Sequence, residues 1–359
     1  MTTSIQQIID GIHPINQAAV AKAMERTAQL VMPPRALGRL HEIGERLCGI
    51  QGTLTPVIRR KAVLVMAGDH GVVAEGISAF PQAVTGAMIQ TFLAGGAGIN
   101  AIARHVGAEV WVADMGILPD LDAASLKNGD RLLVRKVGHG TRNFARGPAM
   151  TLEEAHKAVL TGFELASSLI RKGVDLIGTG DMGIGNTTPS AAIGAAVTGK
   201  SLDEMVGRGT GIDDAGLSRK REVIRRGLDL NRPDPRDGLD LLAKVGGFEI
   251  GGIAGIVLAG AHHRKPVVID GFISTAGALV ACELHPRIRE YLFAAHRSVE
   301  IGHTAMLERL RLQPMLDLQM RPGSFTEAAL GMTLVEASLR LLREVKTFAE
   351  AGVSPGGAS

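Results

Sequence analysis

Residues 178–189 have the sequence GTGDMGIGNTTP, which combines glycines with small side chains that donate hydrogen bonds. The apolar run 174–177 before it predicts a strand, and the residues from 190 onward predict a helix. Glycines let the backbone take positive φ and approach a ligand closely, and Pro189 suits the first turn of a helix. Backbone N–H groups and the positive end of a helix dipole together bind anions. The stretch therefore predicts a phosphate-binding loop.

A second glycine-rich stretch, residues 207–211, precedes a predicted helix with basic residues at 219–221. It matches neither a Walker loop nor a GxGxxG that opens a first βα unit, which disfavours nucleoside-triphosphate hydrolysis and dinucleotide binding. The simpler alternative is that the glycines only form tight turns, but two such loops in one chain favour an anion site. Asp213 and Asp214 either hold a ribose hydroxyl or cap the next helix, and we expect capping.

Histidine and cysteine positions do not indicate a metal site. Asp69 and His70 follow an apolar run, and a single histidine there is more often a hydrogen-bonded structural residue than a catalytic one. The histidines at 262, 263, 296 and 303 lack HExxH spacing. Cys48 and Cys282 lack CxxC spacing, which argues against a zinc site and a disulfide framework. We therefore expect neither a metal nor a cofactor.

The elements that position these residues alternate between apolar runs and helical patterns. Apolar runs at 62–67, 108–113, 174–177 and 266–269 each end in a polar tip, and helical patterns such as 152–171 lie between them. This alternation predicts an α/β fold, a parallel sheet with helices on both faces. Ligands of such sheets bind beyond the carboxyl ends of the strands. The polar tips there are Asp69–His70, Asp114, Asp181 and Asp270.

Composition excludes several classes of protein. The chain has 359 residues, 45% hydrophobic and 21% charged, with a formal net charge of +3, which is typical of a globular protein. Aromatic residues make up 3%, too few for the stacking platforms of single-strand nucleic-acid binders. The N-terminus has no basic and apolar leader, and we find no apolar run of the ~18–20 residues that a membrane span needs. We expect a cytoplasmic protein that binds neither nucleic acid nor membrane.

Several motifs resemble a known family, and they occur in order from about residue 14 to residue 345. They are PPRALGRLHEIGERLCGIQGT, AGDHGVVAEGISAFPQAVT, GDMGIGNTTP, GRGTGIDDAGLSRK, DGFISTAGALVA and HRSVEIGH. These strings resemble the nicotinate-nucleotide:dimethylbenzimidazole phosphoribosyltransferases of cobalamin lower-loop assembly. The resemblance implies a Rossmann-like large domain (40–295), a small helical domain from both termini (1–39 and 296–350) and a homodimer. We expect residues 351–359 to be a disordered tail.

The resemblance also implies a reaction and a set of contacts. Nicotinate mononucleotide and 5,6-dimethylbenzimidazole, or a related aromatic acceptor, would give α-ribazole 5′-phosphate and nicotinate. The residues implied for the phosphate and ribose are Gly183, Gly185, Asn186, Thr187, Gly207, Arg208, Gly209, Thr210, Gly211 and Lys220. Those implied for the acceptor base are Asp69, Ser78, Phe80, Gln82, Met182 and Phe325.

The chain departs from the family where the general base is expected. The family pattern resembles RLGEGTGAA, whereas residues 321–329 read RPGSFTEAA, so that Ser324 stands at the glutamate position and Phe325 at a glycine position. The glutamate of the family's GEMGIGNTT is shortened here to Asp181. A serine hydroxyl without its own base does not accept a proton near neutral pH. Three alternatives follow: Glu327 takes over the role, Asp181 serves instead, or the pocket has changed its acceptor.

The function has alternatives as well. The chain is either an active phosphoribosyltransferase or a catalytically silent homologue that binds a nucleotide or base as a sensor or partner. A third alternative is that the same fold binds another phosphorylated ligand. The candidate catalytic residues of the first alternative are Ser324, Glu327 and Asp181.

Overall fold

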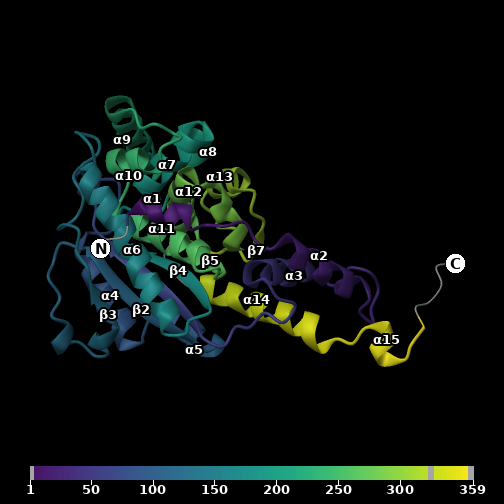
Figure 1. The fold of residues 1–359 in the computed structure, drawn as a ribbon. Coiled ribbons are helices and arrows are strands. Elements are labelled where there is room, and N and C mark those ends of the chain that lie inside the picture. The colour runs from purple at the N-terminus through teal and green to yellow at the C-terminus, as the bar shows by residue number, and fades with distance from the viewer. Residues whose placement is uncertain (1–3, 322–326, 355–359) are drawn as a thin grey trace.

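A parallel sheet forms the centre of the protein (Figure 1). Within residues 4–321 and 327–354, which the computed structural model describes, seven strands form it in the order β3-β2-β1-β4-β5-β6-β7. The order reverses between β1 and β4, and ligands of such sheets bind at this switch point, beyond the carboxyl ends of the strands. The strands are β1 (Lys61–Gly68), β2 (Ala108–Gly116), β3 (Leu132–Val134), β4 (Leu176–Met182), β5 (Val267–Ile269), β6 (Leu292–His296) and β7 (Pro314–Leu316).

Helices cover both faces of the sheet, which confirms the predicted fold class. Helix α11 packs on β1, β2 and β4 with α6 and α12 beside it, and α4, α5 and α14 pack on the other face. Every residue of β1 is consequently buried, as its continuous apolar sequence predicts. The helices are α1 (Ile5–Asp10), α2 (Gln17–Ala28), α3 (Arg39–Gln51), α4 (Ala83–Ala94), α5 (Gly98–Val106), α6 (Leu152–Arg171), α7 (Thr187–Thr198), α8 (Leu202–Met205), α9 (Asp214–Asn231), α10 (Gly238–Val245), α11 (Phe248–His262), α12 (Phe272–Leu284), α13 (His303–Leu310), α14 (Glu327–Glu344) and α15 (Phe348–Ala351).

Strand β4 is longer than the sequence predicts. Residues 178–182 belong to the strand and pair with residues 63–67 of β1, and α7 begins at Thr187, so the loop comprises only 183–186. The interpretation of 178–189 as one loop that leads to a helix at 190 is therefore wrong. The physical reason is packing, because a methyl group at Gly178 would lie 2.8 Å from the Met332 side chain of α14. Glycine at this position lets α14 approach the strand closely, and it is Gly185 in the loop that has positive φ (+89°).

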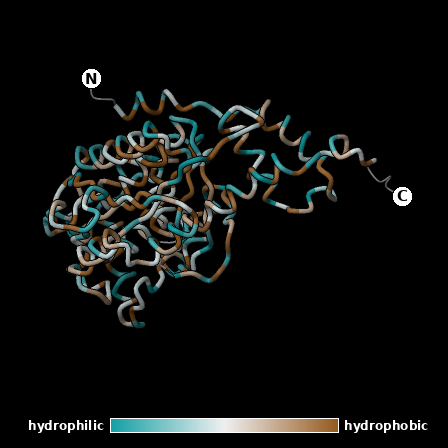
Figure 2. Tube along the Cα trace, turned by 90° about the horizontal axis from the view of Figure 1, so that it is seen from below, coloured by the Kyte–Doolittle hydropathy of each residue, from teal (hydrophilic) through white to brown (hydrophobic). Residues whose placement is uncertain are grey.

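Segments from both ends of the chain form an arm that extends away from the sheet (Figures 1 and 2). Helix α3 packs on α2 and α14, and Leu30 forms a β-bridge with Thr347. Arg26 of α2 pairs with Glu350 of α15 at 3.0 Å. Helix α1, however, packs on α11, and β7 extends the main sheet. The proposed division into a large and a small helical domain thus stays a prediction, and residues 355–359 of the predicted tail lie outside the described residues.

One stretch of the described chain, Ala83–Val106, is long and apolar enough by length and composition to cross a membrane. It consists of two helices, because α4 ends at a left-handed Gly95 and α5 begins at Gly98. Both helices pack on the sheet. The stretch is therefore two shorter helices that pack on the sheet rather than one continuous span.

The close contact between α6 and α11 depends on glycines, and this dependence can be tested. A methyl group at Gly255 would lie 2.1 Å from the main-chain oxygen of Val159. We expect Gly255→Ala to lower the free energy of unfolding by about 1–3 kcal/mol, because the two helices must move apart. Urea titration measures the difference. Gly147→Ala is the control, since no heavy atom of the described residues lies within 4 Å of the added methyl, and equal stability of the two variants would contradict the prediction.

Candidate active site

The two glycine-rich loops meet at one point beside the N-terminus of α7. Lys220 of α9 reaches between them, and its Nζ donates to the Thr187 hydroxyl (2.7 Å) and to the Gly207 main-chain oxygen (3.4 Å). A methyl group at Gly209 would lie 2.8 Å from the Thr187 Oγ1 and 3.2 Å from the Lys220 Nζ. Glycines therefore bring both loops against one buried ammonium group. This arrangement is a suitable cradle for a phosphate.

The charge of Lys220 is poorly compensated. Its side chain is fully buried, and burial lowers the pKa of Lys220 to about 8. The nearby Glu300 carboxylate opposes this lowering. Among the described residues, no carboxylate oxygen lies within 4.0 Å of its Nζ. A buried cation without a close counter-charge is costly unless an anion pairs with it. A ligand phosphate at this point would supply the missing charge.

The remainder of the second loop has structural partners. Arg208 donates to the Ile212 main-chain oxygen (2.9 Å) and contacts Asp214, so its side chain is engaged at the loop surface. Asp213 accepts a hydrogen bond from the Gly216 N–H (2.8 Å) and caps α9. Capping by Asp213, which the sequence predicts, is therefore confirmed.

Three buried carboxyl groups gather at the same edge of the sheet. Asp181, the penultimate residue of β4, accepts a hydrogen bond from the Asn186 side chain (2.9 Å). Asp270 follows β5 and accepts one from the Ala328 N–H (2.5 Å). Glu327 begins α14, and its Oε1 lies 3.9 Å from the His296 Nε2. The three acids belong to distant parts of the sequence, and the parallel sheet brings them together.

Burial and mutual repulsion change the protonation of this carboxyl cluster. Burial raises the pKa of Asp181 to about 7, the Glu249 carboxylate adds to the rise, and the hydrogen bond from Asn186 opposes it. Burial, followed by the charge of Glu327, raises the pKa of Asp270 well above its usual range. Two of the three acids therefore retain protons more readily than ordinary aspartates. Perturbed carboxyl groups of this kind are typical of active sites.

Two buried histidines beside the cluster differ in their hydrogen bonds. His303 accepts the Ser298 N–H on Nδ1 (2.9 Å), so its Nε2 carries the hydrogen and donates to the Thr275 hydroxyl (2.9 Å). Burial lowers the pKa of His303 to about 3, with a further contribution from neighbouring His296. His296 is equally buried, but neither of its ring nitrogens has a hydrogen-bond partner among the described residues. His303 is thus a satisfied structural residue, whereas His296 has unused hydrogen-bonding capacity next to Glu327.

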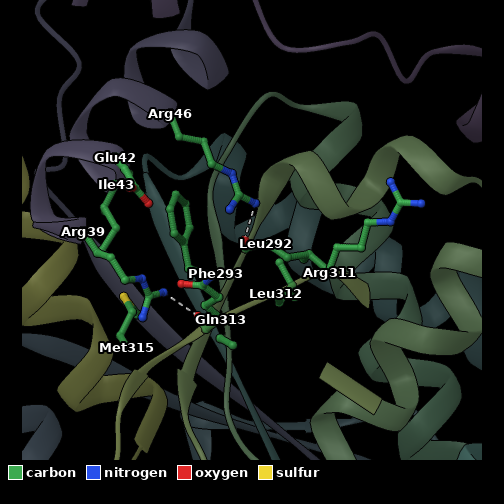
Figure 3. Close-up of a pocket in the computed structure, with 11 residues that line it drawn as sticks. Arg39, Glu42, Ile43, Arg46, Leu292, Phe293, Arg311, Leu312, Gln313 and Met315 are labelled. Carbon is green, nitrogen blue, oxygen red and sulfur yellow. Dashed lines mark hydrogen bonds between the residues drawn. The ribbon is translucent and has the colours of Figure 1, made fainter. Parts of the chain in front are cut away.

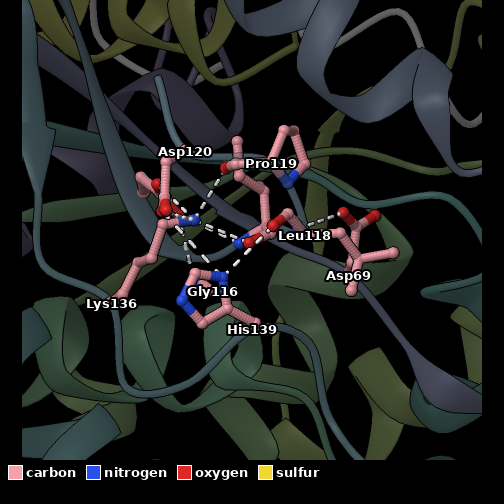
Figure 4. A network of polar contacts seen from close by, with 9 residues as sticks. Asp69, Gly116, Leu118, Pro119, Asp120, Lys136 and His139 are labelled. Carbon is pink, nitrogen blue, oxygen red and sulfur yellow. Dashed lines mark hydrogen bonds and ion pairs between the residues drawn. The ribbon is translucent and has the colours of Figure 1, made fainter. Parts of the chain in front are cut away.

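Asp69, predicted for the acceptor pocket, joins neighbouring loops (Figure 4). Its carboxylate accepts hydrogen bonds from the Thr85 hydroxyl (2.7 Å) and the Leu118 N–H (2.8 Å). Thr85 in turn accepts the Ile184 N–H (3.1 Å) of the phosphate loop. Both oxygens of Asp69 are therefore engaged in holding the site together, and its contact with the acceptor stays a prediction.

Four other residues predicted for the acceptor, Ser78, Phe80, Gln82 and Met182, lie within the described residues. The segment 78–82 is linked to the second glycine loop, because the Ala79 N–H donates to the Thr210 hydroxyl (3.3 Å). Phe80 is half exposed, at 51%, and Gln82 donates to the His70 main-chain oxygen (2.8 Å). Met182 is buried at the end of β4. Ser324 and Phe325 lie outside the described residues.

Sequence reasoning missed Glu249 and Glu300. Glu249, fully buried on α11, lies 2.9 Å from the His70 Nε2, and the pKa of His70 is raised because this carboxylate outweighs the lowering by burial. Glu300 lies beside the cradle and accepts the Gly209 N–H (2.9 Å). The signal for Glu249 was a lone acid in the apolar sequence 248–261, whereas Glu300 lies in a turn with no comparable signal.

A separate cavity of about 260 Å³ lies between α3 and the amino ends of β6 and β7 (Figure 3). Its Arg39 and Arg46 already donate to main-chain oxygens, including that of Pro314 at 2.6 Å. The cavity lies away from the carboxyl ends of the strands. It is therefore a gap between the arm and the sheet rather than part of the candidate site.

The fold and the site define an α/β enzyme that binds a phosphorylated ligand at a topological switch point. The chain matches the family described as phosphoribosyltransferase over residues 12–353. It is 54% identical over 356 residues to the nicotinate-nucleotide–dimethylbenzimidazole phosphoribosyltransferase of Geobacter sulfurreducens, covering 99% of each chain. The protein of the same name from Desulforamulus reducens is 53% identical, over 99% of this chain and 100% of the relative.

Solved structures give the same result. The crystal structure of CobT from Thermus thermophilus superposes with a TM-score of 0.89 at 48% identity, covering 94% of this chain and 100% of that one. The chain therefore belongs to the nicotinate-nucleotide–dimethylbenzimidazole phosphoribosyltransferase family, which confirms the family that the motifs indicate.

The buried charge of Lys220 has a measurable consequence for stability. Because the folded pKa is depressed to about 8, the ammonium destabilises the fold below pH 8, and this penalty disappears as the pH rises toward the ordinary lysine value near ~10.4. We expect Lys220→Met to be more stable than the parent protein at pH 7 by about 1–3 kcal/mol, after its lost hydrogen bonds are counted. Chemical denaturation of both proteins from pH 7 to pH 10 measures this. A stability gap that does not shrink above pH 8 would contradict the prediction.

Proposed function

We propose that the protein transfers phosphoribose from nicotinate mononucleotide to 5,6-dimethylbenzimidazole or a related aromatic acceptor, giving α-ribazole 5′-phosphate and nicotinate. The observation that carries the proposal is the placement of a poorly compensated buried lysine, Lys220, and a buried carboxyl cluster at one edge of the sheet. A nucleotide has an anionic phosphate at one end and, here, a cationic pyridinium ring at the other. The names of the relatives support the same substrates.

The phosphate would bind at the N-terminus of α7. Lys220 and the Thr187 hydroxyl would contact its oxygens, and the glycine loops at 183–186 and 207–211 would close around it. The dianion would replace the missing counter-charge of Lys220 and remove the penalty of its burial. Remote binding energy of this kind positions the ribose carbon C1′ for reaction.

In the reaction, a ring nitrogen of the acceptor forms a bond to C1′ while the bond from C1′ to the pyridinium nitrogen breaks. The bonding electron pair leaves with nicotinate, so that the leaving group needs no proton. Attack from the opposite face converts the β configuration into α. The acceptor must also lose the hydrogen of its second ring nitrogen, which requires a base.

We assign Glu327 as that base. Burial and the charge of Glu327 raise the pKa of Asp270 well above its usual range, and Asp181 accepts a hydrogen bond from Asn186. Glu327 is the third member of the carboxyl cluster, and it lies in the first turn of α14. Asp181 would instead face the ribose, where a partly ionised carboxyl group stabilises the positive charge that develops at C1′.

The acceptor would lie between the segment 78–82 and the carboxyl cluster. Phe80 is the exposed aromatic ring of this segment and would pack on a planar heterocycle. Ser78, Gln82 and Met182 would complete the walls. The bond between the Ala79 N–H and Thr210 would couple closure over the acceptor to closure over the phosphate.

Substitution of Glu327 tests the assignment. We expect Glu327→Gln to reduce kcat by about 10²–10⁴-fold with little change in KM for nicotinate mononucleotide, because only proton transfer is lost. Nicotinate release, followed by chromatography with 5,6-dimethylbenzimidazole as acceptor, measures the rate. Glu344→Gln at the exposed end of the same helix is the matched control.

Two outcomes would contradict these assignments separately. Full activity of Glu327→Gln together with loss of activity in Asp181→Asn would make Asp181 the base and leave the reaction intact. No nicotinate release by the parent protein with benzimidazoles, purines or phenols would contradict the reaction itself. In that case, gain of activity in Ser324→Glu would show that the proton acceptor alone is missing.

We also propose that the protein is a homodimer of the cytoplasm. Its arm exposes apolar side chains, including Met24 (47%), Leu37 (47%) and Val353 (49%), which suit a partner surface. Both cysteines are free, as is usual in a reducing compartment. We expect light scattering coupled to size exclusion to give twice the mass of one chain, 37.7 kDa, at micromolar concentration. A mass of one chain at that concentration would contradict the dimer.

A further inference from the structure

Glu300 hydrogen-bonds to the phosphate cradle through only one of its two carboxylate oxygens. It lies in the turn between β6 and α13 and is buried, with 6% of its surface exposed. Oε1 accepts the Gly209 N–H (2.9 Å), whereas Oε2 is buried and has no hydrogen-bond partner within the part of the chain that the structure describes. A buried carboxylate oxygen without a donor is costly. This oxygen therefore has unused capacity to accept a hydrogen bond.

Close packing at Gly207 and main-chain hydrogen bonds position the Glu300 carboxylate beside the cradle. A methyl group at Gly207 would lie 2.2 Å from Oε2, so glycine at that position allows the carboxylate to approach the main chain. The Glu300 main-chain oxygen also accepts the His303 N–H (3.0 Å), and its own N–H donates to the Ser298 hydroxyl (3.3 Å). Hydrogen bonds with Ser298 and His303 thus fix the main chain of Glu300. Its carboxylate lies near Lys220 but farther from the Nζ than a salt bridge allows.

The chemistry of the missing donor identifies the ligand group. A carboxylate only accepts hydrogen bonds, and on the nucleotide the phosphate oxygens and the nicotinate carboxylate are acceptors that it would repel. The ribose hydroxyls are donors, and they lie next to the phosphate in the same molecule. We infer that Glu300 binds a ribose hydroxyl of the nucleotide and makes the site specific for ribosyl over deoxyribosyl donors.

This inference rests on the proposed function, since it assumes that a nucleotide phosphate lies against Lys220 and Thr187. The glycines at 207, 209 and 211 let the loop shift to admit the hydroxyl to Oε2, and Gly209 and Gly211 have φ values of +52° and +99°. A site that hydrogen-bonds a substrate hydroxyl discriminates strongly against the analogue that lacks it, because its buried acceptor is then left unpaired. The sugar is therefore selected by a residue distinct from those that hold the phosphate.

Binding of three ligands to four proteins tests the inference. Calorimetry measures Kd for nicotinate mononucleotide and its 2′-deoxy and 3′-deoxy analogues with the parent protein, Glu300→Gln, Glu300→Ala and Glu308→Gln, an exposed control on α13. We expect the parent and the control to bind one deoxy analogue about 10–100-fold more weakly than the ribonucleotide. Glu300→Gln should reduce this discrimination, and Glu300→Ala should abolish it.

Other outcomes overturn the inference and can be told apart. Discrimination that persists in Glu300→Ala would mean that another residue binds the hydroxyl. Tighter binding of all three ligands by Glu300→Gln would mean that the carboxylate competes with the phosphate for the Gly209 N–H. No binding of nicotinate mononucleotide by the parent protein would overturn the proposed function and this inference with it, whereas normal turnover with unchanged discrimination in the variants would overturn the inference alone.

Discussion

The carboxyl cluster depends on one hydrogen bond, which runs from the Ala328 N–H to the Asp270 carboxylate (2.5 Å). Asp270 follows β5, and Ala328 lies 58 residues later, in the first turn of α14, so the bond ties the last long helix to the sheet edge. A carboxyl oxygen at a helix N-terminus satisfies one of the N–H groups that have no partner within the helix. Because α14 also packs against Gly178 of β4, Glu327 is held by two independent contacts.

Charges at the carboxyl edge of the sheet are separated rather than paired. Lys220 lies on the side of α7 and α9, where the described chain places no carboxylate within salt-bridge distance. Asp181 lies at the carboxyl end of β4, and Asp270 follows β5 with Glu327 beside it. Burial of each ionised group is unfavourable, and a ligand group of opposite charge offsets this free energy when it binds. In the proposed substrate, the 5′ phosphate is the anionic group that suits Lys220, and the pyridinium nitrogen at C1′ is the cationic centre that suits the acids. The site is therefore organised before the substrate arrives.

The sequence predicts the α/β layers, the position of the phosphate loop and the family, because these follow from local periodicity and specific motifs. It does not predict the length of β4, since Gly178 and Gly180 look like loop residues until α14 and β1 are seen to pack against them. Nor does it predict Glu300, because the contact with Gly209 joins turns 91 residues apart. Short-range patterns determine which elements form, and long-range packing determines which side chains meet.

The position of Glu327 in the first turn of a helix bears on the role proposed for it. It lies near the positive end of the helix dipole, where acidic side chains are favourable. The same position restricts its backbone, and Asp270 anchors the neighbouring residue. A positioned base gains rate from orientation, since misplacement by about 1 Å can reduce the rate ~10²-fold. The Nε2 of His296 lies 3.9 Å from the Glu327 Oε1, and neither ring nitrogen of His296 has a hydrogen-bond partner among the described residues. In the proposed reaction, this ring would offer an acceptor to the Glu327 carboxyl group after it has taken up the proton. Orientation by the first turn of α14 is therefore the contribution of this position to the proposed proton transfer.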